Sequence, residues 1–362
     1  MSSLDAAQCL SPFFARECAA VQPLDPADIR HARARLDALT KPPGSLGRLE
    51  DMAAQLYAVQ RTGVIRARPA RMITIAADHG VVAEGVASSP QAVTRLMVHN
   101  FLQGGAAINA LCASAGADLR VVDAGVAADN FAPHPLLVNA KIARGTANMA
   151  KGPAMSPEQC AAALDLGVRL AEQAHKDGIV LLGTGEMGIG NTTSSSALFC
   201  AFFGFAPQEM AGMGAGVPKA GLEHKCRVIA AALKANAKAA SGNAFAVLAA
   251  LGGLEIAALA GLIVGAAARR MAVAVDGFIS TAAFVAAHAF APAVKEYCFF
   301  SHGSAEAGHK KVLERLGVTP LLDLGMRLGE GTGAALAFLL LDGAARVYND
   351  MATFDGAGIS LT

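Results

Sequence analysis

The strongest candidate for chemistry in this chain is Glu330, a single acid among glycines. The run Gly329-Glu-Gly-Thr-Gly333 follows an apolar stretch, and no other acid lies between Asp323 and Asp342. Glycines at this density let the backbone turn sharply and approach a ligand closely. A carboxylate held in such a turn can act as the base for one proton transfer. The alternative is that Glu330 only occupies the first turn of the next helix, where the helix dipole favours an acid.

A second glycine-rich run, Gly183-Thr-Gly-Glu-Met-Gly-Ile-Gly190, leads into a series of hydroxyl side chains. Backbone N–H groups and the positive end of a helix make such a loop an anion site. The run lacks the lysine of a P-loop, and no acid follows at the distance expected of a dinucleotide fingerprint. It predicts a phosphate or ribose loop, with a plain tight turn as the alternative. The candidate contacts are Glu186, which could accept hydrogen bonds from sugar hydroxyls, and Gly188, Gly190, Asn191 and Thr192.

A third candidate, Ser301-His-Gly-Ser304, is predicted to begin a helix where a phosphate could bind. His302, Glu306 and His309 stand at i, i+4 and i+7, a spacing that resembles that of metal ligands. Against a metal site, His302 precedes the expected helix, and the residues from His309 onward read as a solvated face. We therefore predict no metal.

Two further positions have both a functional and a structural interpretation. Lys225 is either a surface charge or the cation that completes an anion site. Asp78-His79, at the end of an apolar run, is either a catalytic pair or a place where Asp78 caps the next turn. A nucleophile elbow of the Gly-x-Ser-x-Gly type is missing from the sequence. One base combined with phosphate-binding loops suggests group transfer from a phosphorylated sugar.

These side chains need a scaffold, and six short apolar runs predict one. Near-continuous apolar strands that alternate with helical segments indicate a parallel sheet covered on both faces. Ligands bind at the carboxyl ends of the strands in such sheets, and the polar clusters all fall there. The predicted strands are 72–77, 119–122, 179–182, 272–275, 294–300 and 321–324. The predicted helices are 91–115, 157–176, 191–203, 223–239, 281–289, 305–316 and 332–348.

The chain divides into two parts in this interpretation. Residues 1–70 contain no evident strand, and with residues 347–362 they are expected to form a small helical domain. Residues 71–346 are expected to form the α/β catalytic domain.

Composition limits the function classes. Apolar residues make up 54% of the 362 residues and charged residues 16%, with a net charge of +1. Without a basic stripe, nucleic-acid binding has little support. Seven scattered cysteines and a start without a signal-peptide pattern indicate a cytoplasmic protein with reduced thiols. The apolar stretch 244–268 has Glu255 near its centre, so we expect a buried helix rather than a membrane span.

Six segments of the chain can be compared together with known families. They are Lys41-Pro-Pro-Gly-Ser-Leu-Gly-Arg-Leu-Glu50, Ala77-Asp-His-Gly-Val81, Gly185-Glu-Met-Gly-Ile-Gly-Asn-Thr-Thr193, Val275-Asp-Gly-Phe-Ile279, Ser301-His-Gly-Ser-Ala-Glu306 and Leu328-Gly-Glu-Gly-Thr-Gly-Ala334. Together they resemble one family, nicotinate-nucleotide–dimethylbenzimidazole phosphoribosyltransferase, which makes the lower-ligand nucleotide of cobalamin. The resemblance spans roughly residues 35–360 with the motifs in matching order.

The resemblance implies transfer of phosphoribose from nicotinate mononucleotide to 5,6-dimethylbenzimidazole. The products are α-ribazole 5′-phosphate and nicotinate, and the anomeric carbon inverts. It also implies a Rossmann-like six-stranded parallel sheet with a small helical domain from the chain ends, no cofactor, and a homodimer with sites near the subunit interface.

The resemblance also assigns residues to roles. Glu330 matches the general base. Ser88 or Ser89, with Gln91, would lie near the aromatic acceptor. Loop glycines, Lys225 and Ser304 would bind the phosphate. Glu186 and Asp276 would lie near the ribose or the floor of the site, and Gly331 and Thr332 beside the base.

One carboxylate is enough for this chemistry. Nicotinate leaves from a pyridinium nitrogen and needs no proton, whereas a glycosidase must protonate its leaving oxygen. The base only removes the N–H proton of the benzimidazole as the other ring nitrogen attacks the sugar. The residues by themselves are also compatible with two other functions. These are a metal-dependent hydrolase that uses His302, Glu306 and His309, and a non-catalytic nucleotide sensor.

Overall fold

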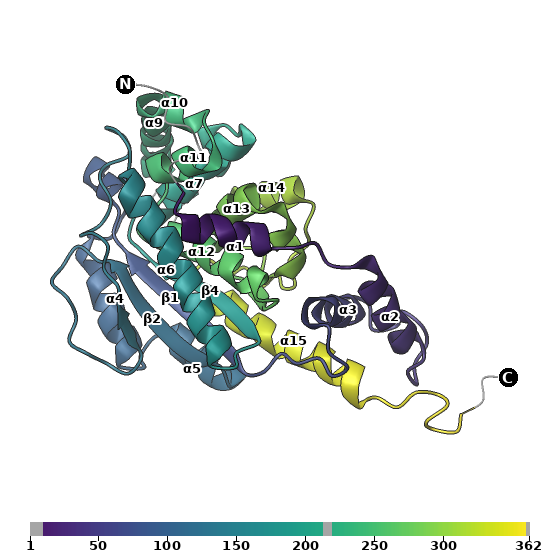
Figure 1. Ribbon diagram of the computed structural model, residues 1–362. Helices are drawn as coiled ribbons and strands as arrows, with labels where there is room; N and C mark the ends of the chain where they lie inside the picture. The colour runs from purple at the N-terminus through teal and green to yellow at the C-terminus, as the bar shows by residue number, and fades with distance from the viewer. Residues whose placement is uncertain (1–9, 213–218, 360–362) are drawn as a thin grey trace.

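The computed structural model describes residues 10–212 and 219–359, which form a parallel α/β structure (Figure 1). Six strands make one sheet in the order β3-β2-β1-β4-β5-β6, and every neighbouring pair is parallel. This is the Rossmann order, in which the chain reverses its direction across the sheet between β1 and β4. The expected Rossmann-like six-stranded sheet is therefore confirmed. The strands are β1 (Ala70–Ala77), β2 (Asp118–Gly125), β3 (Leu137–Asn139), β4 (Leu181–Met187), β5 (Ala272–Val275) and β6 (Cys298–Phe300).

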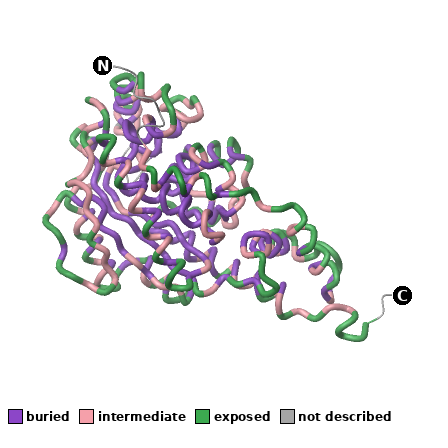
Figure 2. Tube along the Cα trace, viewed as in Figure 1, coloured by how far each residue is buried: buried purple, intermediate pink, exposed green. Residues whose placement is uncertain are grey.

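Strand β1 lies at the centre of the sheet and is buried along its whole length. Its register pairs Thr74 with Val121 of β2 and with Gly185 of β4. Helices cover both faces, which is why β1 reads as a near-continuous apolar run rather than an alternating one. Figure 2 shows this burial as a continuous purple centre.

Two groups of helices cover the sheet. Helices α4 (Ala92–Leu102), α5 (Ala107–Ala115) and α15 (Thr332–Asp350) contact one face. Helices α6 (Pro157–Lys176), α12 (Leu254–Ala268) and α13 (Phe278–Phe290) cover the other, with α12 between α6 and the strands (Figure 1). Apart from the three N-terminal helices, the other elements are α7 (Asn191–Phe203), α8 (Pro207–Met210), α9 (Lys219–Ala235), α10 (Ala237–Ala240), α11 (Ala244–Leu251), α14 (His309–Leu316), and the 3-10 helices η2 (Gly80–Glu84) and η3 (Pro292–Tyr297).

Two helices from the N-terminal part of the chain lie beside the last turns of α15 (Figure 1). Helix α2 (Pro26–Asp37) packs on α3 (Arg48–Gln60), and α3 packs on α15. Backbone hydrogen bonds of 2.9 Å join Thr40 to Ala352 and Phe354 to Ala38. Helix α1 (Pro12–Ala20) instead packs on α6 and α12. The division of the chain into two domains stays a prediction, and residues 1–9 and 360–362 of the smaller one lie outside the described residues.

One predicted strand was wrong. The run 321–324 forms only an isolated bridge, His302 with Leu322, alongside the end of β6. Asp323 and Leu324 are exposed there, so the segment turns away before a strand can form. The sixth strand is β3, a short edge strand that sequence reasoning missed because two of its three residues are only half-buried. As a result, Glu330 follows a loop and not a strand.

Several predicted helices begin or end differently. The helix 91–115 is two helices, because Gly104 has a φ of +78° and a Cβ at Gly105 would lie 2.3 Å from Asn100 Oδ1. The helix 305–316 begins only at His309. The run 294–300 is a strand only at its last three residues. The segment 223–239 divides into α9 and α10.

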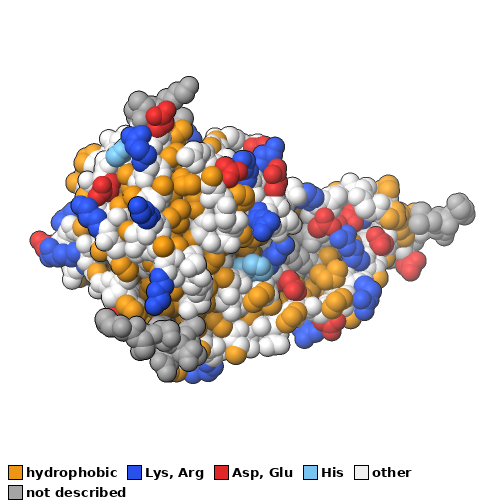
Figure 3. Space-filling model, turned by 90° about the horizontal axis from the view of Figure 1, so that it is seen from above, with side chains coloured by type: hydrophobic (Ala, Val, Ile, Leu, Met, Phe, Trp, Pro, Cys, Tyr) orange, Lys and Arg blue, Asp and Glu red, His pale blue; other side chains and the backbone are white. Residues whose placement is uncertain are grey.

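The long apolar stretch is also divided, into α11 and α12 at Gly252-Gly253. Glu255 lies in the first turn of α12 and is completely buried within the protein. In the part of the chain that the structure describes, none of the helices combines the length and apolar character needed to cross a membrane. On the face shown in Figure 3, acidic and basic side chains are interspersed.

Candidate active site

A cavity of about 360 Å³ opens at the carboxyl ends of β4, β5 and β6. It begins beside the point where the strand order reverses, which is where open α/β sheets bind ligands. The β4–α7 loop, the start of α13 and the segment before α15 form its walls. Seven of the predicted site residues line it: Glu186, Gly188, Gly190, Asn191, Thr192, Asp276 and Ser304.

Glu186 is one of the carboxylates that line this cavity. Its Oε2 accepts a hydrogen bond from the Asn191 side-chain amide, and Gly329 leaves room for its Oε1. Burial, followed by the negative charges of Asp276 and Glu255, raises the pKa of Glu186 to about 8. Glu186 therefore carries a proton over much of the neutral pH range.

Glu330 lies in an unusual backbone conformation. The φ angles of Gly329, Glu330 and Gly331 are +82°, +65° and +97°, so three successive residues are left-handed. The flanking glycines adopt such angles freely, whereas a residue with a Cβ does so at a cost. The Gly-Glu-Gly pattern thus reflects backbone geometry as well as approach to a ligand.

The Glu330 carboxylate is buried but does not line the cavity. Its Oε2 accepts a hydrogen bond of 3.3 Å from the backbone N–H of Ile108, in the first turn of α5. Burial raises the pKa of Glu330, the Ile108 N–H opposes that shift, and the charge of Asp276 adds to it. Glu330 is therefore a stronger base than an exposed glutamate.

Asp276 connects the end of β5 to the start of α15. Its Oδ1 accepts a hydrogen bond of 3.0 Å from the Ala334 N–H, and His302 Nε2 lies 3.8 Å from the same oxygen. Gly333 is required here because a Cβ would lie 2.1 Å from His302 Cδ2. Burial raises the pKa of Asp276, while His302 and the amides of the α15 turn oppose the shift.

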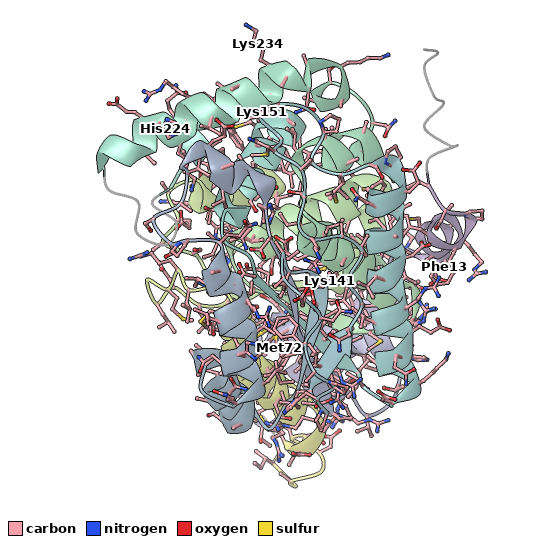
Figure 4. All side chains as sticks on the ribbon, turned by 90° about the vertical axis from the view of Figure 1, so that its left-hand side faces the viewer. Phe13, Met72, Lys141, Lys151, His224 and Lys234 are labelled. Atoms are coloured by element: carbon pink, nitrogen blue, oxygen red, sulfur yellow. The ribbon has the colours of Figure 1, made fainter. Side chains whose placement is uncertain are left out.

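Lys225 is not a surface charge, because its side chain is fully buried. Its Nζ donates to Thr192 Oγ1 at 2.8 Å and to the Gly212 carbonyl at 3.2 Å. Burial lowers the pKa of Lys225 to about 8, and the carboxylate of Glu306 opposes that shift. Lys225 thus supplies a desolvated cation beside the helix that starts at Asn191. Figure 4 shows the neighbouring His224 on α9, whose Nε2 lies 2.5 Å from the Glu84 carbonyl oxygen.

His309, one of the candidate metal ligands, has other partners. His309 Nδ1 accepts the Ser304 N–H at 2.8 Å, and Nε2 lies 2.9 Å from Thr281 Oγ1. Burial lowers the pKa of His309 to about 3. Within residues 10–212 and 219–359, no group of three His, Cys, Asp or Glu side chains could hold a metal ion. Ser304 also precedes the helix by several residues, so the expected helix start at that position was wrong.

Asp78 and His79 have separate partners. The Ala127 N–H donates to Asp78 Oδ2 at 2.8 Å, while His79 Nε2 lies 2.6 Å from Glu255 Oε1. Burial alone would lower the pKa of His79, but the Glu255 carboxylate raises it. The pair is buried behind the glycine loop and does not line the cavity.

The predicted acceptor residues lie at the edge of the site. Ser88, Ser89 and Gln91 do not line the cavity, whereas Val86 and Ala87 do. Gln91 nevertheless starts α4, whose Thr94 Oγ1 accepts the Ile189 N–H of the glycine loop at 3.1 Å. Gly331 and Thr332 are buried in the turn that begins α15.

Sequence reasoning missed the apolar walls of the cavity. Phe278 and Ile279 line it from the first turn of α13, and Leu328 lines it from the segment before Glu330. The sequence could have indicated Phe278 and Ile279, because they directly follow Asp276-Gly277 at the end of a predicted strand, where the other site residues were sought.

The model of a family described as "Phosphoribosyltransferase" matches residues 21–359 of the chain. The chain belongs to this phosphoribosyltransferase family. Transfer of phosphoribose, expected from the sequence, is thereby confirmed as the reaction class, and neither the hydrolase nor the sensor receives support.

Relatives of this phosphoribosyltransferase are similar over nearly the full chain. A nicotinate-nucleotide–dimethylbenzimidazole phosphoribosyltransferase of Solidesulfovibrio magneticus is 57% identical, over 94% of this chain and 97% of that protein. The enzyme of the same name from Nitratidesulfovibrio vulgaris is 54% identical, over 94% of this chain and 96% of that protein. The crystal structure of CobT from Thermus thermophilus superposes with a TM-score of 0.89 at 44% identity, covering 93% of this chain and all of that one.

Proposed function

We propose that this phosphoribosyltransferase moves 5-phosphoribose from nicotinate mononucleotide to 5,6-dimethylbenzimidazole. The names of the relatives supply these two substrates. The observation that carries the proposal is one cavity in which a glycine loop adjoins both the buried Lys225–Thr192 pair and the carboxylates of Glu186 and Asp276. The products would be α-ribazole 5′-phosphate and nicotinate, with inversion at the anomeric carbon. This chemistry calls for no cofactor.

The phosphate would bind at the start of α7. Helix α7 begins at Asn191 directly after the glycine loop, and the positive end of its dipole favours an anion there. Thr192 and Ser304 line the same part of the cavity, and the Lys225 ammonium donates to Thr192. In a buried site, each of these donors interacts with a phosphate more strongly than it would in water.

Glu330 would act as the general base. The sugar carbon loses its bond to the pyridinium nitrogen of nicotinate as a ring nitrogen of the acceptor forms a new one. The electron pair of the broken bond neutralises the pyridinium, so the leaving group takes no proton. Glu330 would accept the proton from the other ring nitrogen of the benzimidazole, in exchange for its present hydrogen bond from Ile108. A base of this kind contributes about 10²–10⁴-fold to the rate.

The other assigned residues would bind and orient the substrates. Glu186, protonated near neutral pH, would hydrogen-bond a ribose hydroxyl without repelling the phosphate. Ser88 or Ser89 and Gln91 would contact the acceptor ring from the start of α4. Asp276 would lie on the floor of the site and Gly331 with Thr332 beside the base. Correct orientation of two bound reactants accounts for much of the remaining acceleration.

We further infer a homodimer that functions in the cytoplasm, with the chain divided into the small helical and the α/β domains described from the sequence. Leu324 and Leu328 support the dimer, because they are 60% and 58% exposed on the loop before Glu330. A group of exposed apolar side chains can mark a surface that contacts a second subunit.

Product analysis tests the proposed function. The purified chain is mixed with nicotinate mononucleotide and dimethylbenzimidazole in the presence of a chelator, and both products are measured by chromatography. We expect equal amounts of nicotinate and α-ribazole 5′-phosphate. A sensor would bind the mononucleotide without consuming it, and a hydrolase would release nicotinate without needing the acceptor.

A further inference from the structure

We infer that Thr74 is a positioning residue for Glu330, an inference that rests on the proposed function. Thr74 lies in the middle of β1 and is completely buried. Its Oγ1 donates a hydrogen bond of 2.9 Å to the backbone carbonyl of Glu330, 256 residues away in the chain. Thr74 does not line the cavity, and this hydrogen bond is the contact through which it would act on Glu330.

The hydrogen bond acts on the most strained part of the site. Glu330 is one of three non-glycine residues with a positive φ in the described part of the chain, and it is flanked by two left-handed glycines. Such a segment has many alternative conformations, because glycine allows most of them. A fixed partner for the Glu330 carbonyl selects one conformation, and β1, a buried central strand of the sheet, supplies that partner.

Strand β4 is shaped to let this contact form. Gly185 pairs with Thr74 across the sheet, and a Cβ at Gly185 would lie 2.3 Å from the Glu330 carbonyl oxygen and 2.7 Å from Thr74 Oγ1. Any side chain at Gly185 would therefore separate the hydroxyl from the carbonyl. A glycine in the interior of a strand often marks such a close backbone approach.

The segment is fixed on its other side as well. Asp276 Oδ1 accepts the Ala334 N–H at 3.0 Å, which holds the first turn of α15 against the end of β5. Thr332 Oγ1 bonds back to the Gly329 carbonyl at 2.9 Å. The Glu330 backbone is thus anchored to β1 through its carbonyl and to β5 through the turn that follows.

The backbone torsion angles at Glu330 determine the direction of its Cα–Cβ bond, and so the place of its carboxylate. Without the Thr74 hydroxyl, the carbonyl loses a buried partner and the peptide can rotate. A displacement of about 1 Å at a catalytic group can lower the rate by roughly 10²-fold. Thr74 would thus affect proton transfer while leaving substrate binding in place.

A series of substitutions at Thr74 tests this role. Thr74→Val keeps the shape and removes the donor, Thr74→Cys supplies a weaker donor, and Thr74→Ser keeps the hydroxyl. We expect kcat to fall about 10- to 100-fold in the valine variant, less in the cysteine variant and little in the serine variant. The KM for nicotinate mononucleotide should stay within about twofold in all three. Wild-type kcat in the valine variant would overturn the inference.

A double variant separates positioning from general damage. In a Glu330→Gln background there is no base to misplace, so Thr74→Val should cause little further loss of turnover. An equal proportional loss in both backgrounds would overturn the inference, because Thr74 would then act independently of Glu330.

A structural measurement, which does not depend on enzyme activity, separates the test of this inference from the test of the proposed function. A crystal structure of the most perturbed variant that folds should show residue 330 outside its left-handed conformation or its carbonyl turned away from β1. An unchanged backbone there would overturn the inference, whatever the enzyme's activity. If the wild-type chain consumes no nicotinate mononucleotide, the proposed function fails while this structural result still stands or falls by itself.

Discussion

At the scale of single residues, two carboxylates next to one another have different surroundings. Glu186 faces the cavity and bonds to Asn191, whereas Glu330 is turned to the Ile108 N–H at the start of α5. Burial raises the pKa of both, but the charges of Asp276 and Glu255 raise that of Glu186 further, to about 8. Carboxylates with such different environments can take separate roles, here a neutral hydrogen-bonding group and a base.

Glu186→Gln should change how stability depends on pH. Between the ordinary pKa of 4.5 and about 8, folded Glu186 keeps a proton that the unfolded chain has lost. The wild-type chain should therefore lose stability as pH rises through this window, by on the order of a few kcal/mol. The Glu186→Gln variant should not lose stability in this way as pH rises. The free energy of unfolding is measured with urea at pH 5, 6.5 and 8, with the exposed Glu223→Gln as the control. Parallel pH dependence of wild type and Glu186→Gln would contradict the account.

At the scale of elements, the segment before α15 has the most unusual backbone conformation in the site. Three residues with positive φ bring the chain from an exposed loop into the buried start of the helix. Met72 in β1 packs under this turn, at the centre of the sheet (Figure 4). The loop is therefore shaped by the sheet below it as much as by its own glycines.

Gly331→Ala should disrupt this segment. The φ of Gly331 is +97°, and a Cβ there would lie 2.4 Å from Met72 Sδ. We expect a loss of roughly 1–3 kcal/mol in stability from the strained backbone, and a fall in turnover because Glu330 moves. Gly343→Ala in the same helix is the control, since a Cβ there meets nothing within 4 Å. It should leave turnover unchanged and raise the unfolding temperature slightly. Equal behaviour of the two variants in unfolding and turnover assays would rule out this explanation.

The Lys41–Glu50 ion pair should stabilise the folded conformation of the loop before α3. The pair is 2.8 Å long, its side chains are 6% and 2% exposed, and the Leu46 N–H also donates to Glu50. Glu50→Gln leaves a buried ammonium without its counter-charge, so we expect a loss on the order of 3 kcal/mol in unfolding free energy. Asp51→Asn, which breaks the exposed pair with Arg33, is the neighbouring control and should cost little.

The Lys41–Glu50 ion pair should also make the stability of the protein depend on pH. Burial alone would raise the pKa of Glu50, but the hydrogen bonds from Lys41 and Leu46 lower it below 4.5. The stabilisation is therefore present above the ordinary pKa and lost as pH falls below it. Acid unfolding of wild type and Glu50→Gln should converge at low pH, and a constant difference would argue against the ion pair as the cause.

Much of the fold could be predicted from the sequence, because buried parallel strands leave continuous apolar runs. Strands β1, β2, β4 and β5 are recognised this way. The run 321–324 forms no strand because Asp323 and Leu324 are exposed, and the apolar residues of the edge strand β3 form too short a run to be recognised as a strand. In the site, motif positions identify Glu186, Lys225 and Asp276 as candidates. Thr74 and Ile108 could not be predicted, because each contacts Glu330 from a distant part of the chain.

At the scale of the whole molecule, the order of the strands determines where the site lies. The sheet reverses between β1 and β4, and the glycine loop, Lys225 and the α15 turn gather on the carboxyl side of that point. Helices α2 and α3 lie beside α15, away from α9 and α11, whereas α1 packs on α6 and α12 (Figure 1).

The full chain should be a dimer in solution. Leu324 and Leu328 would otherwise leave apolar surface in water next to the cavity. Sedimentation at micromolar concentration is expected to give twice the mass of one chain, and Leu328→Lys should shift the population toward single chains. A single-chain mass for a fully active wild-type sample would refute the dimer.

The most direct test of the account is turnover by Glu330→Gln. With nicotinate mononucleotide and dimethylbenzimidazole, we expect nicotinate release to fall by about 10²–10⁴-fold, while mononucleotide affinity and the unfolding temperature stay close to wild type. Near-normal turnover in this variant would contradict the central claim that Glu330 takes the proton of the acceptor.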